Sequence, residues 1–363
     1  MTLTTPTEHL PKILCHHAFS AVHPSFLASE KVTAESVPVS SGPYRVQSVT
    51  KDEILFVKNE KYWDRENVAI PSIKLIVSSD AETVSARFNR GEINWLGGTA
   101  MVGSIMDRQS IHVTPMFSTE YFFFRSTRGP WADSRVRNAL LLAVPWADLR
   151  ANYIIPATTL VFPIAGYPTF KGIETQDIDG AKKKLAEAGY GPDKPLDAVI
   201  IRIPESESFM DLAKKLKDAW VKIGLTVEIK SLPSAEYYST LREDNYSVAI
   251  TSWIGDFADP LAFLEMFRPG SSLNDSGWNN AAFEALIVEA ATLTDGKARY
   301  AKLAEAEKLL LADGVILPIA HNPALNIIDT NGLAGWYPNP LDVHPFKFLR
   351  FVAPKALPGV ALL

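Results

Sequence analysis

Residues 246–260 read YSVAITSWIGDFADP, and the rest of the chain is organised around this stretch. Its first half is β-branched, small and aromatic, a composition that predicts a buried strand. The stretch then turns at Gly255 and carries two carboxylates, Asp256 and Asp259, before a proline. A strand that stops at an acidic, glycine-containing turn leaves its last backbone groups beside a carboxylate. That arrangement suits an extended ligand that carries a positive amine.

The plainer interpretation of the same turn is the N-terminus of a helix. Asp259 would cap the helix, and Pro260 would occupy its first position. We assign Asp259 to this role. Asp256 remains open between an ordinary turn residue and a ligand-binding residue.

The segments before this stretch alternate between strand and helix patterns. Strands are expected at 198–203 and 225–229, separated by a helix at 208–223 whose apolar residues share one face. A second helix at 235–243 leads to the strand at 246–253. This βαβαβ order predicts a parallel sheet with right-handed crossovers. Ligands of such sheets bind at the carboxyl ends of the strands, where the acidic turn lies.

The other segments are patterned more weakly. Residues 1–41 are rich in Ser, Pro and His, and the pattern sharpens from residue 42. Alternating apolar residues predict strands, and apolar residues at helical spacing predict helices. The expected strands are 44–49, 53–58, 73–78, 92–96, 120–125, 315–319 and 346–352, and the expected helices include 179–189, 280–292 and 297–312.

Composition narrows the class of protein. The 363 residues suffice for two domains and a large core, and a charged fraction of 21% is ordinary for a soluble protein. A net charge of −5 gives no reason to expect nucleic acid or an anionic membrane surface as a partner. No run approaches the ~18 apolar residues of a membrane span. The N-terminus has neither the basic nor the apolar region of an export signal.

Sequence motifs for catalysis are missing. The chain has no GxGxxG, GxxxxGK[ST], GxSxG or HExxH pattern, and nothing near the two carboxylates of the acidic turn would stabilise an electrophile. The single Cys15 excludes an internal disulfide, and its neighbours His16, His17 and His23 have a spacing that fits no standard zinc site. We expect no metal, no cofactor and no enzymatic activity.

The acidic turn resembles a segment of the peptide/nickel class of ABC-transporter solute-binding proteins, above all the oligopeptide-binding members. The pattern W-x-x-D-[YF]-x-[DE]-P of that family is matched by Trp253, Asp256, Phe257, Asp259 and Pro260. Family motifs of the types [ST]-G-[PA]-Y, K-N-x-x-Y-W and G-E-[IL]-[DN] also occur here in order, as SGPY, KNEKYW and GEIN. The ordered series makes the resemblance specific.

The resemblance implies an α/β fold of the two-lobed periplasmic-binding-protein type (type II, cluster C-like), truncated at its N-terminus. Residues 1–41 would be a remnant of the N-terminal subdomain, and 42–124 would belong to lobe I. Lobe II, with the βαβαβ segment, would span 125–322, and 323–363 would return to lobe I. The first crossing is expected near 126–129. The resemblance covers nearly the whole chain, but relatives carry on the order of 150 further residues ahead of it.

The resemblance also implies a function. The chain would be the substrate-binding component of an ABC transporter, a periplasmic monomer that captures short peptides between its lobes for a membrane permease. Asp256 would pair with the amine of the peptide, and backbone groups from Ser252 to Ile254 would hydrogen-bond the peptide as an added strand. Trp253 would line the pocket, and Gly255 would belong to the same ligand-binding turn. The partner would be a peptide or a similar amine-bearing solute.

Three alternatives remain open. Oligopeptide relatives often have an arginine where this chain has Ile250, so recognition of the peptide carboxylate is undecided. The ligand is alternatively an opine, glutathione or a nickel chelate. A truncated remnant that binds nothing is the third alternative.

Overall fold

The computed structural model describes residue 7 and residues 10–24, 39–98, 100–243 and 245–353. The chain divides into two compact units. Unit 1 consists of residues 1–16 and 117–322, and unit 2 consists of residues 17–116 and 323–363.

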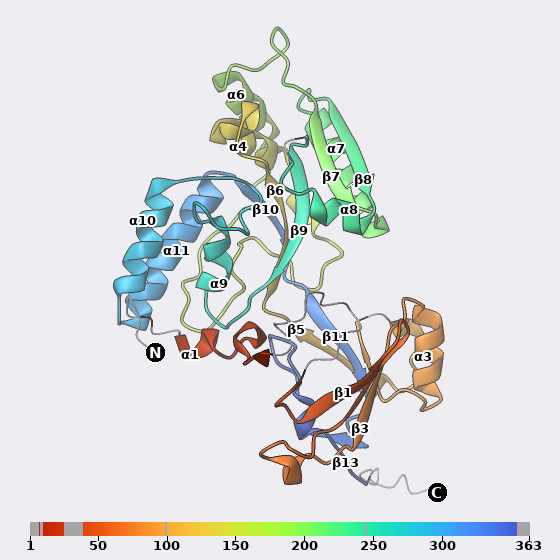
Figure 1. Cartoon of the computed structure of the whole chain (residues 1–363). Helices are drawn as coiled ribbons and strands as arrows, with labels where there is room; N and C mark the ends of the chain where they lie inside the picture. The colour runs from red at the N-terminus through yellow and green to blue at the C-terminus, as the bar shows by residue number, and fades with distance from the viewer. Residues whose placement is uncertain (1–6, 8–9, 25–38, 99, 244, 354–363) are drawn as a thin grey trace, which may run out of the picture. The chain divides into compact units, whose positions relative to one another are not determined.

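The centre of unit 1 is a five-stranded sheet (Figure 1). Its strands are β6 (Ser118–Phe124), β7 (Val199–Pro204), β8 (Val227–Leu232), β9 (Val248–Ile254) and β10 (Ile316–Ala320). They are ordered β10-β6-β9-β7-β8. β8, β7 and β9 run parallel, as the βαβαβ pattern predicts, but β6 pairs antiparallel with both β9 and β10. The expected parallel sheet is therefore mixed, because two strands from outside the βαβαβ segment join it.

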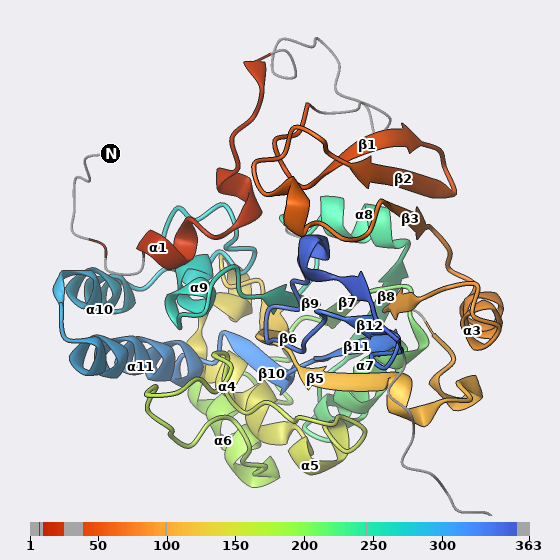
Figure 2. The ribbon, with the colours of Figure 1, turned by 90° about the horizontal axis from the view of Figure 1, so that it is seen from below.

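Helices surround this sheet, and several begin at a side-chain cap. Asp133, Asp177, Asn280 and Asp295 each accept a hydrogen bond from a first-turn N–H group, which satisfies a backbone donor that the helix leaves unpaired. The helices of unit 1 are α1 (Leu10–Ile13), α4 (Ser134–Ala143), α5 (Trp146–Leu149), α6 (Ile178–Glu187), α7 (Glu207–Val221), α8 (Ser234–Ser239), α9 (Leu261–Leu264), α10 (Ala281–Thr292) and α11 (Gly296–Ala312). α10 and α11 lie side by side in both ribbon views (Figures 1 and 2).

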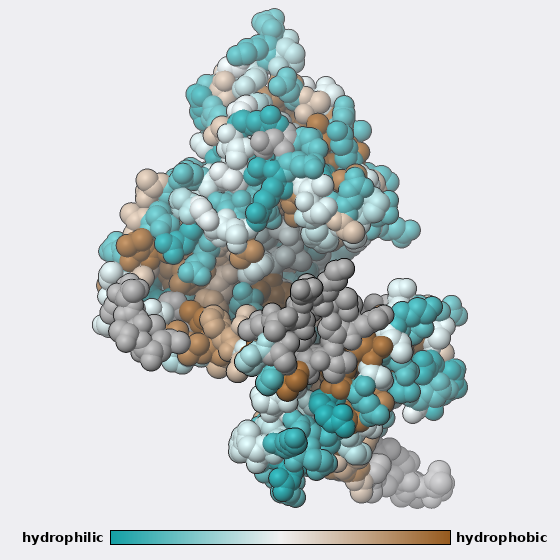
Figure 3. Space-filling model, in the orientation of Figure 1, coloured by the Kyte–Doolittle hydropathy of each residue, from teal (hydrophilic) through white to brown (hydrophobic). Residues whose placement is uncertain are grey.

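Amphipathic patterning explains which faces are buried. β6 is buried at every position, as expected for a strand covered on both faces. α6 turns Ala181 and Leu185 inward and exposes Lys182 and Lys183. The surface around α6 is accordingly hydrophilic (Figure 3). Among the helices that the structure describes, none has both the length and the apolar character to cross a membrane.

Unit 2 contains two three-stranded sheets and a two-stranded ribbon, ordered β1-β2-β3, β4-β11-β5 and β12-β13. All of their pairings are antiparallel. The expected hairpin is present as β1 and β2. The elements are β1 (Tyr44–Val49), β2 (Glu53–Lys58), β3 (Ser72–Ile76), α3 (Ala81–Asn89), β4 (Trp95–Gly97), β5 (Ile111–Pro115), β11 (Pro323–Ile328), β12 (Leu333–Ala334) and β13 (Arg350–Phe351).

Short 3₁₀ helices connect these elements. They are η1 (His17–Phe19), η2 (Arg65–Asn67), η3 (Val102–Ser104), η4 (Arg108–Ser110), η5 (Gly129–Ala132), η6 (Glu265–Phe267) and η7 (Phe346–Phe348). The strand expected at 346–352 is wrong over its first half, where η7 follows Pro345 and only β13 is extended.

The division between the units differs from the expected one at the first crossing. It falls between Met116 and Phe117, ahead of the expected position near 126–129. The reason is that β6, which was assigned to lobe I, is hydrogen-bonded on both sides within the sheet of unit 1. The return falls between Asn322 and Pro323. Residues 10–16 belong with unit 1, although the range 1–41 was expected to form an N-terminal remnant of its own.

Candidate functional site

Strand β9 has a continuous partner on one side only. β6 pairs with every residue of β9, whereas β7 pairs with it only at Val248 and Ala249. β7 pairs with β9 only as far as Arg202, although it continues to Pro204 before the chain leads to α7. In the described parts of the chain, the edge of β9 over residues 250–254 therefore has no strand partner on the side away from β6.

The register of the ladder indicates which backbone groups face this open edge. The Gly255 N–H donates to the Phe117 carbonyl over 2.8 Å, toward β6. Backbone groups alternate in direction along an antiparallel strand, so those of Trp253 also face β6, whereas those of Ser252 and Ile254 face the open edge. The hydroxyl of Tyr237 donates to the Ile250 carbonyl on that side. An extended ligand at this edge meets Ser252 and Ile254.

The turn after β9 is built on close packing. A Cβ atom at Gly255 would lie 2.4 Å from the Phe117 ring, so only glycine fits there. Phe117 packs edge-on against Phe263, with ring centroids 4.8 Å apart. The half-buried Trp253 side chain is fixed by a 2.8 Å hydrogen bond from Nε1 to the Ala262 carbonyl. Gly255 thus shapes the turn and uses its own N–H within the fold.

Asp256 presents its carboxylate at the end of the open edge. Its side chain is 47% exposed, and it lines a cavity of about 330 Å³ together with Trp253. The segment around α1 contacts the same turn within unit 1. His16 Nε2 lies 3.5 Å from Asp256 Oδ1, and Lys12 Nζ donates to the Ala258 carbonyl over 3.1 Å.

Asp259 has a structural role that combines capping and charge pairing. Its side chain is 1% exposed, and its Oδ1 accepts a hydrogen bond from the Leu261 N–H at the start of α9. The helix begins at Leu261 with Pro260 as its N-cap, one residue later than expected. Arg299 on α11 donates to both carboxylate oxygens over 2.7 and 2.8 Å. No pattern in the sequence linked Arg299 to the turn.

The start of β6, next to β9, is held in place by hydrogen bonds between buried polar groups. Thr119 lies opposite Trp253 in the ladder, and its hydroxyl donates to the Leu160 carbonyl over 2.6 Å. His321 Nδ1 lies 3.0 Å from the same hydroxyl oxygen, and burial lowers the pKa of His321 to about 4.

Glu307 on α11 holds the adjoining loop. Its carboxylate accepts hydrogen bonds of 2.8 Å from the N–H groups of Leu160 and Val161 and one of 2.7 Å from the Tyr167 hydroxyl. The residue is completely buried, and this burial raises the pKa of the carboxyl group to about 7. Both buried groups were missed from sequence, because a lone Glu or His in a helix or strand pattern carries no sign of its burial.

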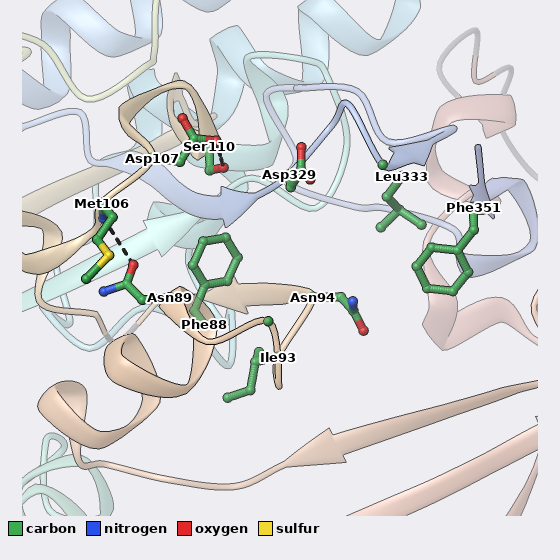
Figure 4. Close-up of a pocket in the computed structure, with 12 residues that line it drawn as sticks. Phe88, Asn89, Ile93, Asn94, Met106, Asp107, Ser110, Asp329, Leu333 and Phe351 are labelled. Carbon is green, nitrogen blue, oxygen red and sulfur yellow. Dashed lines mark hydrogen bonds between the residues drawn. The ribbon is translucent and has the colours of Figure 1, made fainter. Parts of the chain in front are cut away.

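Two other regions contain features of the kind that form sites, namely a cysteine near the N-terminus and a cavity in unit 2. Cys15 is exposed, and its Sγ donates to the Pro11 carbonyl. Across the described ranges, no group of three or more His, Cys, Asp or Glu side chains is placed to hold a metal ion. Unit 2 contains a cavity of about 290 Å³ with Phe88 and Asp329 in its lining (Figure 4). Around it, Asn89 Oδ1 accepts from the Met106 N–H over 3.0 Å. None of the predicted site residues lies in this cavity.

The sequence is similar to those of several proteins named as peptide-binding proteins. The chain is 25% identical over 341 residues to the oligopeptide-binding protein OppA of Bacillus subtilis, covering 87% of this chain and 62% of the relative. It is 26% identical over 338 residues to the periplasmic murein peptide-binding protein MppA of Escherichia coli, covering 87% of this chain and 62% of that protein. The chain thus spans less than two thirds of the length of these relatives.

Solved structures share the fold. The structure of the Escherichia coli murein tripeptide binding protein MppA matches with a TM-score of 0.83 at 25% identity, covering 97% of this chain and 72% of that chain. Haemophilus influenzae OppA in complex with the peptide RPPGFSPFR matches with a TM-score of 0.79 at 18% identity, covering 97% and 73%, which shows the fold alone. The α/β fold of two-lobed peptide-binding proteins, which the sequence predicted, is confirmed. The model of the bacterial extracellular solute-binding proteins, family 5 Middle, matches residues 1–275, and the chain belongs to this family.

Proposed function

We propose that this chain captures short peptides at the open edge of β9, as the substrate-binding component of an ABC transporter. The peptide would extend the sheet by pairing with the backbone groups of Ser252 and Ile254. Its terminal amine would lie against Asp256, just beyond the end of the strand. The observation that carries the proposal is the unpartnered edge of β9 next to an exposed carboxylate.

Backbone pairing along β9 and the charge pair at Asp256 would contribute differently to the affinity for the peptide. An exposed ion pair contributes only about 0–1 kcal/mol, because water screens both charges. Asp256 is half exposed, so its pairing with a ligand amine gains strength only when the bound peptide excludes water from the carboxylate. His16, 3.5 Å from Asp256, is the side chain that a ligand amine would have to join or replace.

Family membership supports the wider role. Extracellular solute-binding proteins act outside the cytoplasmic membrane, so we infer a periplasmic or extracellular location, a membrane permease as partner and a role in binding without catalysis. These inferences rest on family members that are longer than this chain.

The test is binding of a matched pair of peptides, one with a free amine and one N-acetylated, by calorimetry. Asp256→Asn should weaken binding of the free-amine peptide by about tenfold and leave the acetylated one unchanged. Asp193→Asn, an exposed carboxylate in a loop of unit 1, is the control and should change neither. Equal losses for both peptides with Asp256→Asn would contradict the assigned role.

A thermal melt with mixed di- to pentapeptides tests whether the chain binds peptides at all. A ligand that binds only the native state raises its stability, by about 2.7 kcal/mol at a hundred times the dissociation constant. A cooperative melt that no peptide shifts would contradict the proposed function.

A further inference from the structure

A second cavity of unit 1, of about 310 Å³, is lined in part by β6, the strand that pairs with β9. Its lining includes Glu120 on β6, Asn152 and Tyr153 after α5, and Ser208 and Asp211 on α7. Glu120 stands directly opposite Ser252 in the β6–β9 ladder. Directly opposed residues project their side chains from the same face of a sheet. The cavity therefore opens on the face of β9 that carries the Ser252 side chain.

Glu120 is a buried carboxylate with neutral partners. It is 7% exposed, and it accepts a 2.7 Å hydrogen bond from the Tyr153 hydroxyl and another from the Asn322 side chain. Within the described parts of the chain, no Lys, Arg or His side chain forms an ion pair with it. Burial raises the pKa of Glu120, as expected for a carboxylate whose charge the fold does not compensate.

The other charged side chains at the cavity do not neutralise the negative charge of Glu120. Lys215 is the cation in its lining, and its Nζ lies 3.7 Å from both Asp211 and Asp148. Its charge is thus shared between these two carboxylates. The cavity combines a surplus of negative charge with one desolvated carboxylate, and this combination favours a cationic group.

Strand geometry limits how such a group reaches Glu120. A peptide added at the open edge of β9 would be two strand spacings from β6, or about 10 Å. Its side chains alternate between the two faces of the sheet, so every second one points to the Glu120 face. A short side chain cannot bridge this distance. A lysine or arginine extends ~6–7 Å from its Cα atom, which carries its charged end across β9 toward β6.

We propose that this cavity is a specificity pocket for a lysine or arginine side chain of the bound peptide, with Glu120 as its specificity-determining residue. The proposal rests on the proposed peptide-binding function and adds the chemical class of ligand that the site prefers. The ammonium or guanidinium group would hydrogen-bond Glu120 in place of the missing protein cation.

The experiment measures dissociation constants by calorimetry for a tripeptide series on the whole chain. The members differ at one position, which is moved through the peptide and carries lysine, ornithine, 2,3-diaminopropionate or norleucine. At the position that faces Glu120, the lysine peptide should bind about 10- to 100-fold more tightly than the norleucine peptide, as expected for a charge-assisted hydrogen bond. Diaminopropionate, whose amine is too short to reach, should give no gain.

Glu120→Gln keeps an acceptor for Tyr153 but removes the charge. It should bring the lysine-to-norleucine ratio close to one and leave the affinity for the norleucine peptide unchanged. Glu228→Gln, an exposed glutamate on β8, is the control and should preserve the ratio. A purely structural role for Glu120 would instead weaken both peptides equally.

The results separate the two proposals. If peptides bind but lysine gives no advantage at any position, the specificity pocket is wrong and the proposed function stands. If Glu120→Gln lowers both affinities equally, the pocket is likewise overturned. If no peptide in the series binds, both proposals fail.

Discussion

Arg299 and Asp259 form a buried, bidentate ion pair that joins α11 to the turn carrying Asp256. The guanidinium donates to both carboxylate oxygens over 2.7 and 2.8 Å, and the side chains are 7% and 1% exposed. Two parallel hydrogen bonds fix orientation as well as distance. The acidic turn after β9 is thus held on one side by Phe117 and on the other by Arg299.

Replacing Arg299 with methionine should destabilise the fold strongly. The substitution removes both hydrogen bonds of the pair and leaves the buried Asp259 carboxylate with only the half-exposed Lys12, whose Nζ lies 3.8 Å away, as a cation. Breaking a buried pair in this way typically lowers the free energy of unfolding by about 3 to 5 kcal/mol. Urea unfolding followed by circular dichroism measures the change. Lys183→Met removes the 79% exposed partner of Glu187 and should leave the transition where it is. A shift for Arg299→Met no larger than for this control would contradict the role of the pair.

Gly255→Ala should distort the turn, because the added methyl group would lie 2.4 Å from the Phe117 ring. Overpacking of this kind destabilises by about 1 to 3 kcal/mol, and the shift of Phe117 should also lower peptide affinity. Gly296→Ala is the matched control, since a Cβ atom at the start of α11 meets nothing within 4 Å. It should leave stability unchanged or slightly increased. Equal effects of both substitutions in urea unfolding would exclude the packing argument.

Glu307 should make the stability depend on pH. Burial raises its pKa to about 7, compared with 4.5 for the exposed group. The folded state then binds a proton more tightly than the unfolded state. Its contribution is fully present below pH ~4.5 and is lost as the pH rises through ~7, a difference of about 3 kcal/mol. Glu307→Gln keeps the acceptor for Leu160 and Val161 without this titration.

The measurement is urea unfolding of both proteins from pH 5 to pH 8. The stability of Glu307→Gln relative to the original chain should rise from pH 5 to about pH 7 and level off above it. A difference that does not change with pH would show that Glu307 titrates normally.

His321 should make the stability depend on pH in the direction opposite to that of Glu307. Burial lowers its pKa to about 4 from 6.5, so the folded state resists protonation. Its contribution is present above pH ~6.5 and is lost as the pH falls through ~4. His321→Asn should therefore reduce the loss of stability on acidification from pH 7 to pH 4. If the variant and the original chain lose stability in parallel, this assignment is wrong.

Local patterns in the sequence predicted the elements around the site. The run before Gly255 indicated β9, and the βαβαβ order indicated the parallel part of the sheet, because strand and helix periodicity are recorded in neighbouring residues. The acidic turn and its resemblance to peptide-binding proteins singled out Asp256. Whether Asp256 binds an amine stays a prediction.

Contacts between segments far apart in the chain could not be predicted from the sequence. The antiparallel position of β6 between β9 and β10 depends on pairing with segments far away in the chain, and this pairing moved the first division between the units to Phe117. No pattern in the residues of β7 or β9 indicates that the two strands separate and leave the edge of β9 without a strand partner. The partnership of Asp259 with Arg299 was invisible for the same reason.

The strand order of unit 2 has a consequence for the order of folding. β11 is the central strand of its sheet, between β4 and β5, yet it begins at Pro323, whereas β5 ends at Pro115. During synthesis from the N-terminus, β4 and β5 must wait for their partner until the whole segment from Phe117 to Asn322 has been made. That segment contains its complete five-stranded sheet and is free to fold first. We therefore expect the β4-β11-β5 sheet to form late and slowly. Until it forms, the unpaired edges of β4 and β5 are where the nascent chain is most prone to aggregate.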